Sequence, residues 1–259
     1  MKSDFMTRII GIISGKGGVG KTIVSINLAA ALHRWFGKKV LLVDCNVSTS
    51  HIGLYLGLYS TPITLNDVLR GTVTAEKAIY EHQSGIKVMP ASLKLADMKD
   101  IEWENFKERL KEIFEGYDFV ILDSSPGFGK ESMLTLGTCS EAIFVTNPII
   151  HSAVDLVKCK ELSKELGINS LGIVLNMVRN RKYELSIKEV RELVELNVIS
   201  SIPYDEKITK SIVSKQAFVS DGNSKAHREF KRLAQIVSGE HYLEEESGFF
   251  RKFFGFLKS

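Results

Sequence analysis

Eight residues near the start of the chain have the types and spacing of a phosphate-binding loop. They follow an apolar run of strand length, fit the pattern GxxxxGK[S/T] and comprise Gly15, Lys16, Gly17, Gly18, Val19, Gly20, Lys21 and Thr22. Glycines allow close backbone approach, so successive N–H groups can surround phosphate oxygens at the amino end of a helix. Lys21 can neutralise the β and γ phosphates, and the hydroxyl of Thr22 can ligate Mg²⁺. The segment predicts a site for a nucleoside triphosphate with Mg²⁺.

A second lysine, Lys16, lies inside this loop, where in a single subunit it would crowd Lys21. The form GKGGVGKT is the deviant Walker A motif, and over nearly its whole length the chain resembles the MinD/ParA family of P-loop ATPases, most closely its MinD branch. The resemblance implies that the nucleotide is ATP and that both lysines are catalytic. It also implies that Lys16 reaches the phosphates of a second subunit in an ATP-dependent homodimer. The alternative is a solvated loop lysine.

Two aspartates, Asp44 and Asp123, each end an apolar run of strand length. By the resemblance, Asp44 belongs to the first switch segment, near the loop lysine and the metal, and is a catalytic residue. Asp123 matches the Walker B position and would hold Mg²⁺ through water, while Thr22 ligates it. Pro126–Gly127 would form the second switch, which senses the γ-phosphate. An aspartate at the end of a strand is often only a turn former, but the order of these residues after a phosphate loop favours the functional interpretation.

Three residues are expected to bind the adenine base. Asn176 ends an apolar run and matches the family's adenine-reading asparagine, whose amide can both donate to and accept from the ring edge. Pro203 and Asp205 match the family's Ile-Pro-Glu-Asp loop, in which Tyr204 here replaces the glutamate. Each has a simpler alternative, because an asparagine or aspartate at such a point often only caps a helix.

Two positions depart from the family pattern. Asn46 stands where the family has a second aspartate that polarises the attacking water. An amide can orient water but cannot act as a base, and loss of a positioned base costs ~10²- to 10⁴-fold. We therefore assign Asn46 a catalytic, water-orienting role and expect slow hydrolysis with long-lived ATP-bound dimers. Ile149 replaces a carboxylate near the expected dimer contact, which leaves nucleotide specificity and subunit affinity open.

The elements that must position these residues alternate between strand and helix. Apolar runs of strand length are expected at 8–14, 39–44, 86–89, 118–123, 142–147, 171–176 and 198–202, and amphipathic stretches of helical length at 21–36, 103–114, 152–166, 186–196 and 225–237. This alternation is typical of a parallel sheet covered on both faces. We predict a doubly wound, mostly parallel α/β fold of the P-loop NTPase type in one domain, residues 1–238, followed by an acidic tether at 239–248.

The last residues, 249–259, predict an amphipathic helix that binds membranes. At ~100° per residue the apolar side chains share one arc and the basic ones lie off it. The residues expected to contact anionic lipid are Phe249, Phe250, Arg251, Lys252, Phe253, Phe254, Phe256, Leu257 and Lys258. A single short helix binds weakly, whereas two linked copies in a dimer gain ~10²-fold in avidity. MinD-like proteins carry a similar helix. The alternative is a final helix packed on the domain's own core.

Composition narrows the class of protein. The 259 residues are 44% hydrophobic and 25% charged, as in globular proteins. The net charge of +3 does not indicate nucleic-acid binding, and no apolar stretch is long enough for a membrane span. Three cysteines, Cys45, Cys139 and Cys159, cannot form a four-cysteine metal site or a disulfide framework, and the amino end does not resemble a signal peptide. We expect a cytoplasmic protein, peripheral on the inner face of the cell membrane.

The resemblance supports one leading function and three alternatives. The leading one is a membrane-cycling ATPase that positions the division site or a polar apparatus, with an activator or cargo protein that is unknown. Asn46 and Ile149 favour instead a scaffold that binds ATP and hardly hydrolyses it. A ParA-like DNA-partitioning ATPase would need a basic surface, and we expect no specific nucleic acid. Iron-protein reductases share the loop but need paired cluster cysteines, which this chain lacks.

Overall fold

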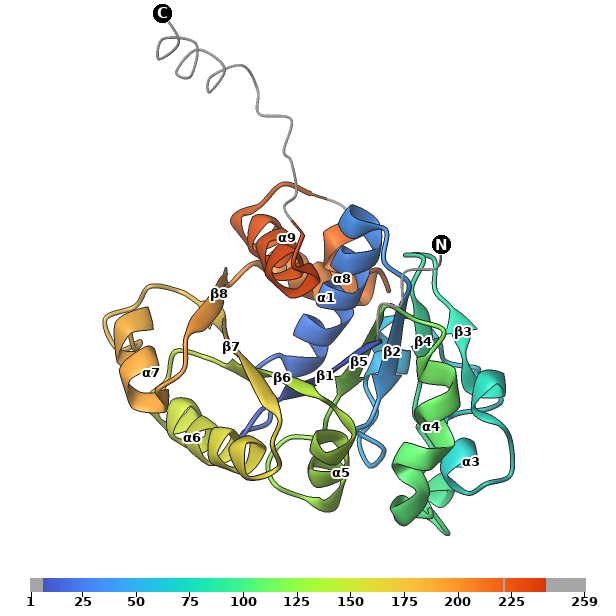
Figure 1. Cartoon of the computed structure of the whole chain (residues 1–259). Helices are drawn as coiled ribbons and strands as arrows, with labels where there is room; N and C mark the ends of the chain where they lie inside the picture. The colour runs from blue at the N-terminus through green and yellow to red at the C-terminus, as the bar shows by residue number, and fades with distance from the viewer. Residues whose placement is uncertain (1–6, 221, 241–259) are drawn as a thin grey trace, which may run out of the picture.

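The computed structural model of the chain describes residues 7–220 and 222–240. Within these, one sheet of eight strands has the order β3-β4-β2-β5-β1-β6-β7-β8 (Figure 1). The strands are β1 (Arg8–Ile13), β2 (Val40–Asp44), β3 (Tyr80–Glu81), β4 (Lys87–Met89), β5 (Phe119–Asp123), β6 (Glu141–Thr146), β7 (Asn169–Val178) and β8 (Val198–Pro203). All neighbouring pairs are parallel except β3 with β4. The predicted doubly wound, mostly parallel α/β fold is confirmed.

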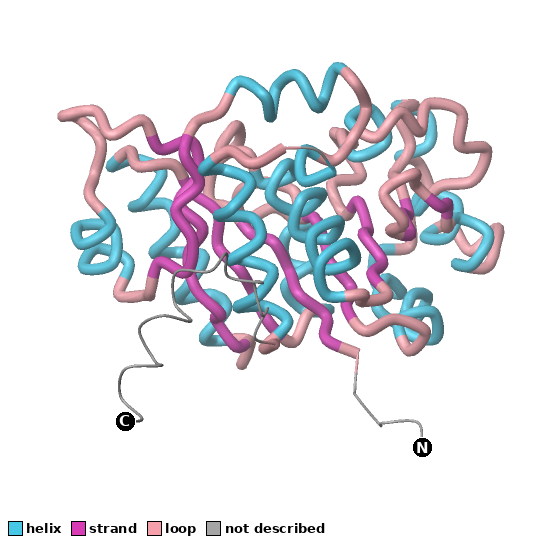
Figure 2. The backbone as a smooth tube through the Cα atoms, turned by 90° about the horizontal axis from the view of Figure 1, so that it is seen from above, coloured by secondary structure: helices cyan, strands magenta, loops and turns pink. Residues whose placement is uncertain are grey.

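Helices cover both faces of this sheet (Figures 1 and 2). The α-helices are α1 (Lys21–Phe36), α2 (Ile52–Tyr55), α3 (Leu65–Leu69), α4 (Phe106–Phe114), α5 (Lys130–Thr138), α6 (Ile150–Glu165), α7 (Ile187–Val194), α8 (Glu206–Val213) and α9 (Lys225–Ser238). In Figure 1, α1, α8 and α9 lie on one side of the sheet, and α3 to α7 on the other.

Side chains of the central strands alternate between two apolar cores, one on each face. In β2, Val40 and Leu42 pack toward α1 and α9, whereas Leu41 and Val43 pack toward α3 and α4. All four are fully or almost fully buried. Strands buried on both faces have little polar alternation, which is why the apolar runs in the sequence were continuous.

The predicted elements match the observed ones to within a few residues, with one exception in type. Residues Trp103–Asn105, expected to begin a helix, form a 3-10 turn before α4. The sequence interpretation missed α2, α3, α5, α8 and the short antiparallel strand β3. These are four to nine residues long or, for β3, two, so they contain too few periods to stand out from loop sequence.

Of the predicted acidic tether, the structure describes only the first two residues, Gly239 and Glu240. Gly239 ends α9 with a positive φ of 71°, and the carboxylate of Glu240 pairs with Lys38. The rest of the tether and the predicted membrane helix at 249–259 lie outside the described residues. Among the residues that are described, none of the helices has the length and apolar character that crossing a membrane requires.

Candidate functional site

The phosphate loop joins β1 to α1 and borders a pocket of about 360 Å³. Residues 16–22 of the loop line this pocket, as do Asn46, Thr49, His51, Tyr55, Pro126, Met177 and Ile212. The predicted phosphate loop and water-orienting residue therefore share one pocket. Gly15 is not among the residues that line it.

Glycine is needed in this loop both for conformation and for close contact. Gly18 and Gly20 have φ angles of 80° and 86°, which L side chains rarely adopt. A Cβ atom on Gly20 would also lie 2.2 Å from the amide nitrogen of Asn176. Gly15 has ordinary φ, but a Cβ there would lie 2.6 Å from the Cβ of Asp155 in α6. The loop is thus packed between β7 and the amino-terminal part of α6.

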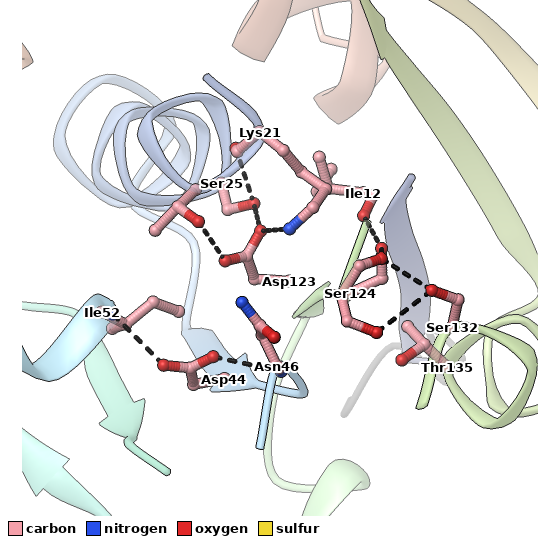
Figure 3. Close-up of polar contacts among 12 residues, drawn as sticks. Ile12, Lys21, Ser25, Asp44, Asn46, Ile52, Asp123, Ser124, Ser132 and Thr135 are labelled. Carbon is pink, nitrogen blue, oxygen red and sulfur yellow. Dashed lines mark hydrogen bonds and ion pairs between the residues drawn. The ribbon is translucent and has the colours of Figure 1, made fainter. Parts of the chain in front are cut away.

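Asp123 at the end of β5 accepts hydrogen bonds from polar side chains in the first turns of α1 (Figure 3). Lys21 donates to its Oδ1 at 2.9 Å, Ser25 donates to the same oxygen at 2.8 Å, and Thr22 donates to Oδ2 at 2.7 Å. Lys21 and Asp123 are 6% and 1% exposed, so this is a buried ion pair. The predicted metal residues Thr22 and Asp123 therefore lie in direct contact.

A second buried carboxylate, Asp44, lies beside Asp123, because β2 and β5 pair in register at these two residues. Burial, and then the negative charge of Asp123, raise the pKa of Asp44 to about 7. Its oxygens accept hydrogen bonds from the Ser50 hydroxyl at 2.7 Å and from the backbone N–H groups of Asn46 and Ile52, each at 3.2 Å. Asp44 therefore anchors the loop after β2, the predicted first switch.

The charges and oxygen atoms of these side chains fit ATP with Mg²⁺. Two carboxylates, Asp44 and Asp123, are buried at adjacent strand ends, and Lys21 pairs with Asp123. A divalent cation would balance the second negative charge. The Thr22 hydroxyl donates a hydrogen bond to Asp123, which leaves the lone pairs of the Thr22 oxygen available to a metal. Carboxylate and hydroxyl oxygens are ligands that Mg²⁺ prefers.

Lys16 projects from the loop without a partner in the described part of the chain. It is exposed, lines the pocket, and makes no side-chain hydrogen bond or ion pair with any described residue. Lys21 by contrast is buried and paired. The two lysines therefore occupy different environments, one exposed and one buried.

The amide of Asn46 faces the pocket but makes both of its hydrogen bonds with Thr49. Its nitrogen donates to the Thr49 carbonyl at 2.8 Å, and its oxygen accepts from the Thr49 hydroxyl at 2.9 Å. Thr49 also lines the pocket and was not foreseen from the sequence. The oxygen of Asn46 keeps one lone pair that could orient water.

The three predicted adenine residues do not line the pocket. Asn176 is buried next to the phosphate loop, where its amide donates to the Val19 carbonyl at 2.9 Å. Asp205 caps α8 by accepting from the Lys207 N–H at 2.9 Å. Pro203 ends β8. Their role toward a base stays a prediction.

Three apolar or aromatic residues that sequence reasoning missed also line the pocket: Tyr55, Met177 and Ile212, which we call the apolar wall. Met177 directly follows Asn176 and has a positive φ of 60°, while the other two lie on α2 and α8. Tyr55 and Ile212 carried no local signal, since both belong to short helices that were not predicted.

Comparison with known proteins assigns the chain to a family. Residues 10–218 match the model of the CobQ/CobB/MinD/ParA nucleotide binding domain. An uncharacterized ATP-binding protein from Methanocaldococcus jannaschii is 38% identical, with 80% of this chain and 78% of that protein covered. The septum site-determining protein MinD of Pyrococcus horikoshii, complexed with Mg-ADP, superposes with a TM-score of 0.86 at 32% identity, over 90% and 96% of the two chains.

A third neighbour is the MinC:MinD cell division protein complex of Aquifex aeolicus, with a TM-score of 0.80 at 27% identity over 93% of this chain and 100% of that one. These matches confirm the resemblance that the motifs indicated. The chain belongs to the CobQ/CobB/MinD/ParA family of nucleotide-binding proteins and is similar to MinD.

Proposed function

We propose that this chain is a MinD-like ATPase that binds ATP with Mg²⁺, hydrolyses it slowly, and pairs with a second copy to position machinery such as the division site. The observation that carries the proposal is the contrast between the two loop lysines. Lys21 is buried on Asp123, whereas Lys16 is exposed and without a side-chain partner in the described residues. The Mg-ADP of the Pyrococcus neighbour supports the cofactor assignment.

Within one subunit, the chemistry would be divided among residues already in contact. Bound Mg²⁺ would neutralise phosphate charge. The Thr22 hydroxyl and, through water, Asp123 would hold it, since they already lie 2.7 Å apart. The Lys21 ammonium would move from Asp123 toward the β and γ phosphates. Asn46 would orient the attacking water through its oxygen, without taking the proton, which is the reason for slow turnover.

Exposed apolar residues on two segments that contact the phosphate loop, at Gly127 and at Asp155, support pairing with a second copy. We call Phe128, Ile149, Ile150 and Val154 the Lys16 rim; they are 43%, 40%, 47% and 43% exposed. The backbone N–H of Gly127, next to Phe128, donates to the Ser14 carbonyl just before the phosphate loop. Exposed apolar side chains beside a functional loop are typical of a protein contact. Ile149, which replaces a family carboxylate, would thus add apolar contact where the family has charge.

The experiment that tests the activity is phosphate release by the full chain with Mg-ATP, with and without vesicles of anionic lipid. We expect slow turnover that depends on Mg²⁺. Nucleotide binding without phosphate release under either condition would favour the ATP-binding scaffold instead. The hydrogen bonds between the Asn46 amide and Thr49 support that alternative.

Location at the inner face of the cell membrane remains a further part of the proposal. It is supported by the sequence of residues 249–259, which lie outside the described structure. Anionic vesicles should sediment the full chain with ATP but not with ADP. A chain truncated after residue 247 should stay in the supernatant, and its sedimentation would show that the tail is not the anchor. The MinC:MinD complex of the Aquifex neighbour supports the proposal of a protein partner.

A further inference from the structure

A single carboxylate, Glu131, connects the two loops that follow β2 and β5. Glu131 lies in the first turn of α5, and its Oε1 accepts a hydrogen bond from the backbone N–H of Ser48 at 3.0 Å. Its Oε2 accepts from the Ser48 hydroxyl at 3.2 Å. Ser48 belongs to the loop after β2, 83 residues earlier in the chain. The contact therefore joins two segments that approach each other only because their strands are neighbours in the sheet.

The next residue of the same helix, Ser132, contacts the loop after β5. Burial raises the pKa of the Glu131 carboxyl, and hydrogen bonding to Ser48 and Ser125 opposes this shift. Ser125 is held in turn by Ser132, whose hydroxyl donates to the Ser125 carbonyl at 2.7 Å. A carboxylate that accepts several hydrogen bonds binds its donors more strongly than a neutral group would.

Both loops reach the nucleotide pocket immediately beside these contacts. Asn46 and Thr49 flank Ser48 and line the pocket, and Pro126, which follows Ser125, lines it as well. The backbone of Ser48 thus connects the Glu131 carboxylate to the two residues that share the amide hydrogen bonds described above.

We propose that Glu131 is a positioning residue that couples the two loops and fixes Asn46 for the attack of water, so that it sets the rate of hydrolysis and not the affinity for nucleotide. The inference rests on the proposed function, because it assigns a part in the same reaction. Glu131 itself does not line the pocket and does not act on substrate.

A purely structural role is the competing explanation, because a carboxylate in the first turn of a helix also stabilises the helix dipole. The substitution Glu131→Asp separates the two. It keeps the negative charge at the start of α5 but shortens the side chain by one methylene, so that it no longer reaches both donors of Ser48. The companion substitution Ser48→Ala removes one of the two hydrogen bonds from the opposite loop.

The experiment measures steady-state phosphate release and binding of a fluorescent ADP analogue for the full chain and these variants. For Glu131→Asp we expect kcat to fall about tenfold, because a small misplacement of reacting groups is costly, with KM and ADP affinity within about twofold of wild type. Ser48→Ala should give a smaller fall and add little to the loss in the double variant, since both act on one contact. Wild-type kcat in Glu131→Asp, or equal losses of kcat and ADP affinity, would overturn the inference.

A second measurement keeps the inference testable if the wild type binds nucleotide but releases no phosphate, which would remove only the hydrolytic part of the proposed function. Hydrogen exchange of the backbone amides in residues 46–52 is then compared with a non-hydrolysable ATP analogue bound. Faster exchange in Glu131→Asp than in wild type supports the coupling. Equal exchange in the two proteins contradicts it.

Discussion

In the phosphate half of the pocket, residues 16–22 contribute one continuous segment of the lining, whereas the apolar wall brings together Tyr55, Met177 and Ile212 from three separate elements. The first half contains the backbone N–H groups of the phosphate loop and the Lys21 ammonium, which forms a buried ion pair with Asp123. The second half contains the apolar side chains of Met177 and Ile212 and the aromatic ring of Tyr55. The phosphate loop is therefore encoded in one contiguous segment, whereas the apolar wall exists only because the fold brings three elements to the same pocket.

The largest effect should follow from removing Lys21. Lys21→Met leaves Asp44 and Asp123 buried without their cation, which typically costs about 3 to 5 kcal/mol in free energy of unfolding. The double variant Lys21→Met, Asp123→Asn should recover much of that stability, because no unpaired carboxylate remains at Asp123. Urea unfolding measures the stability, and fluorescent nucleotide binding measures the function. If the double variant regained nucleotide affinity together with stability, the phosphate half would not need the lysine.

Next in size is the effect of restoring the family's aspartate. Asn46→Asp introduces a group that can accept a proton from water, so kcat for phosphate release should rise by ~10²-fold, the lower end of the ~10²- to 10⁴-fold range of a positioned base. The new carboxylate would face the Thr49 carbonyl, to which Asn46 now donates at 2.8 Å. The variant Thr49→Ser is the matched control, since it keeps the hydroxyl. An unchanged kcat in Asn46→Asp would remove Asn46 as the cause of slow turnover.

The elements and site residues also differ in how readily the amino-acid sequence predicts them. The sheet, the main helices and the phosphate loop were predictable, because buried strands are continuous apolar runs and the loop motif is contiguous. Thr49 and Ile212 were not, since the first lies in an irregular loop and the second in an eight-residue helix. Asn176 was expected only to read the adenine base, and its hydrogen bond to the Val19 carbonyl was not predictable because it depends on how β7 packs against the phosphate loop.

A smaller effect concerns pH, through Asp44 in the phosphate half. Its pKa of about 7 in the folded protein exceeds the ordinary value of 3.8, so the folded state binds the proton more tightly than the unfolded state. Stability is therefore lost as pH rises between these values, by about 1 kcal/mol from about pH 6 to about pH 8. Urea unfolding without nucleotide and with a metal chelator measures the slope. Asp44→Asn should flatten it, and an equal slope in that variant would assign the titration to another group.

The smallest effect is expected at the apolar wall. Ile212→Ala should weaken ATP binding by roughly three- to tenfold, because a half-buried side chain loses the contact of about one to two methylene groups at ~0.8 kcal/mol each, while kcat stays unchanged. Val213→Ala is the matched control, since Val213 is on the same helix, does not line the pocket and is 78% exposed. A fall in kcat without a change in KM would contradict the division of labour between the two halves.

The most direct test of the account is the mass of the full chain in solution, measured by light scattering during size exclusion. With a non-hydrolysable ATP analogue and Mg²⁺ we expect a dimer of two 28.9 kDa chains, and with ADP a monomer. Lys16→Ala should remain monomeric with the analogue while still binding it, because Lys16 has no side-chain partner in the described part of its own subunit. A wild-type chain that binds the analogue and stays monomeric, or a Lys16→Ala variant that dimerises as well as wild type, would contradict the claim that Lys16 acts across two subunits.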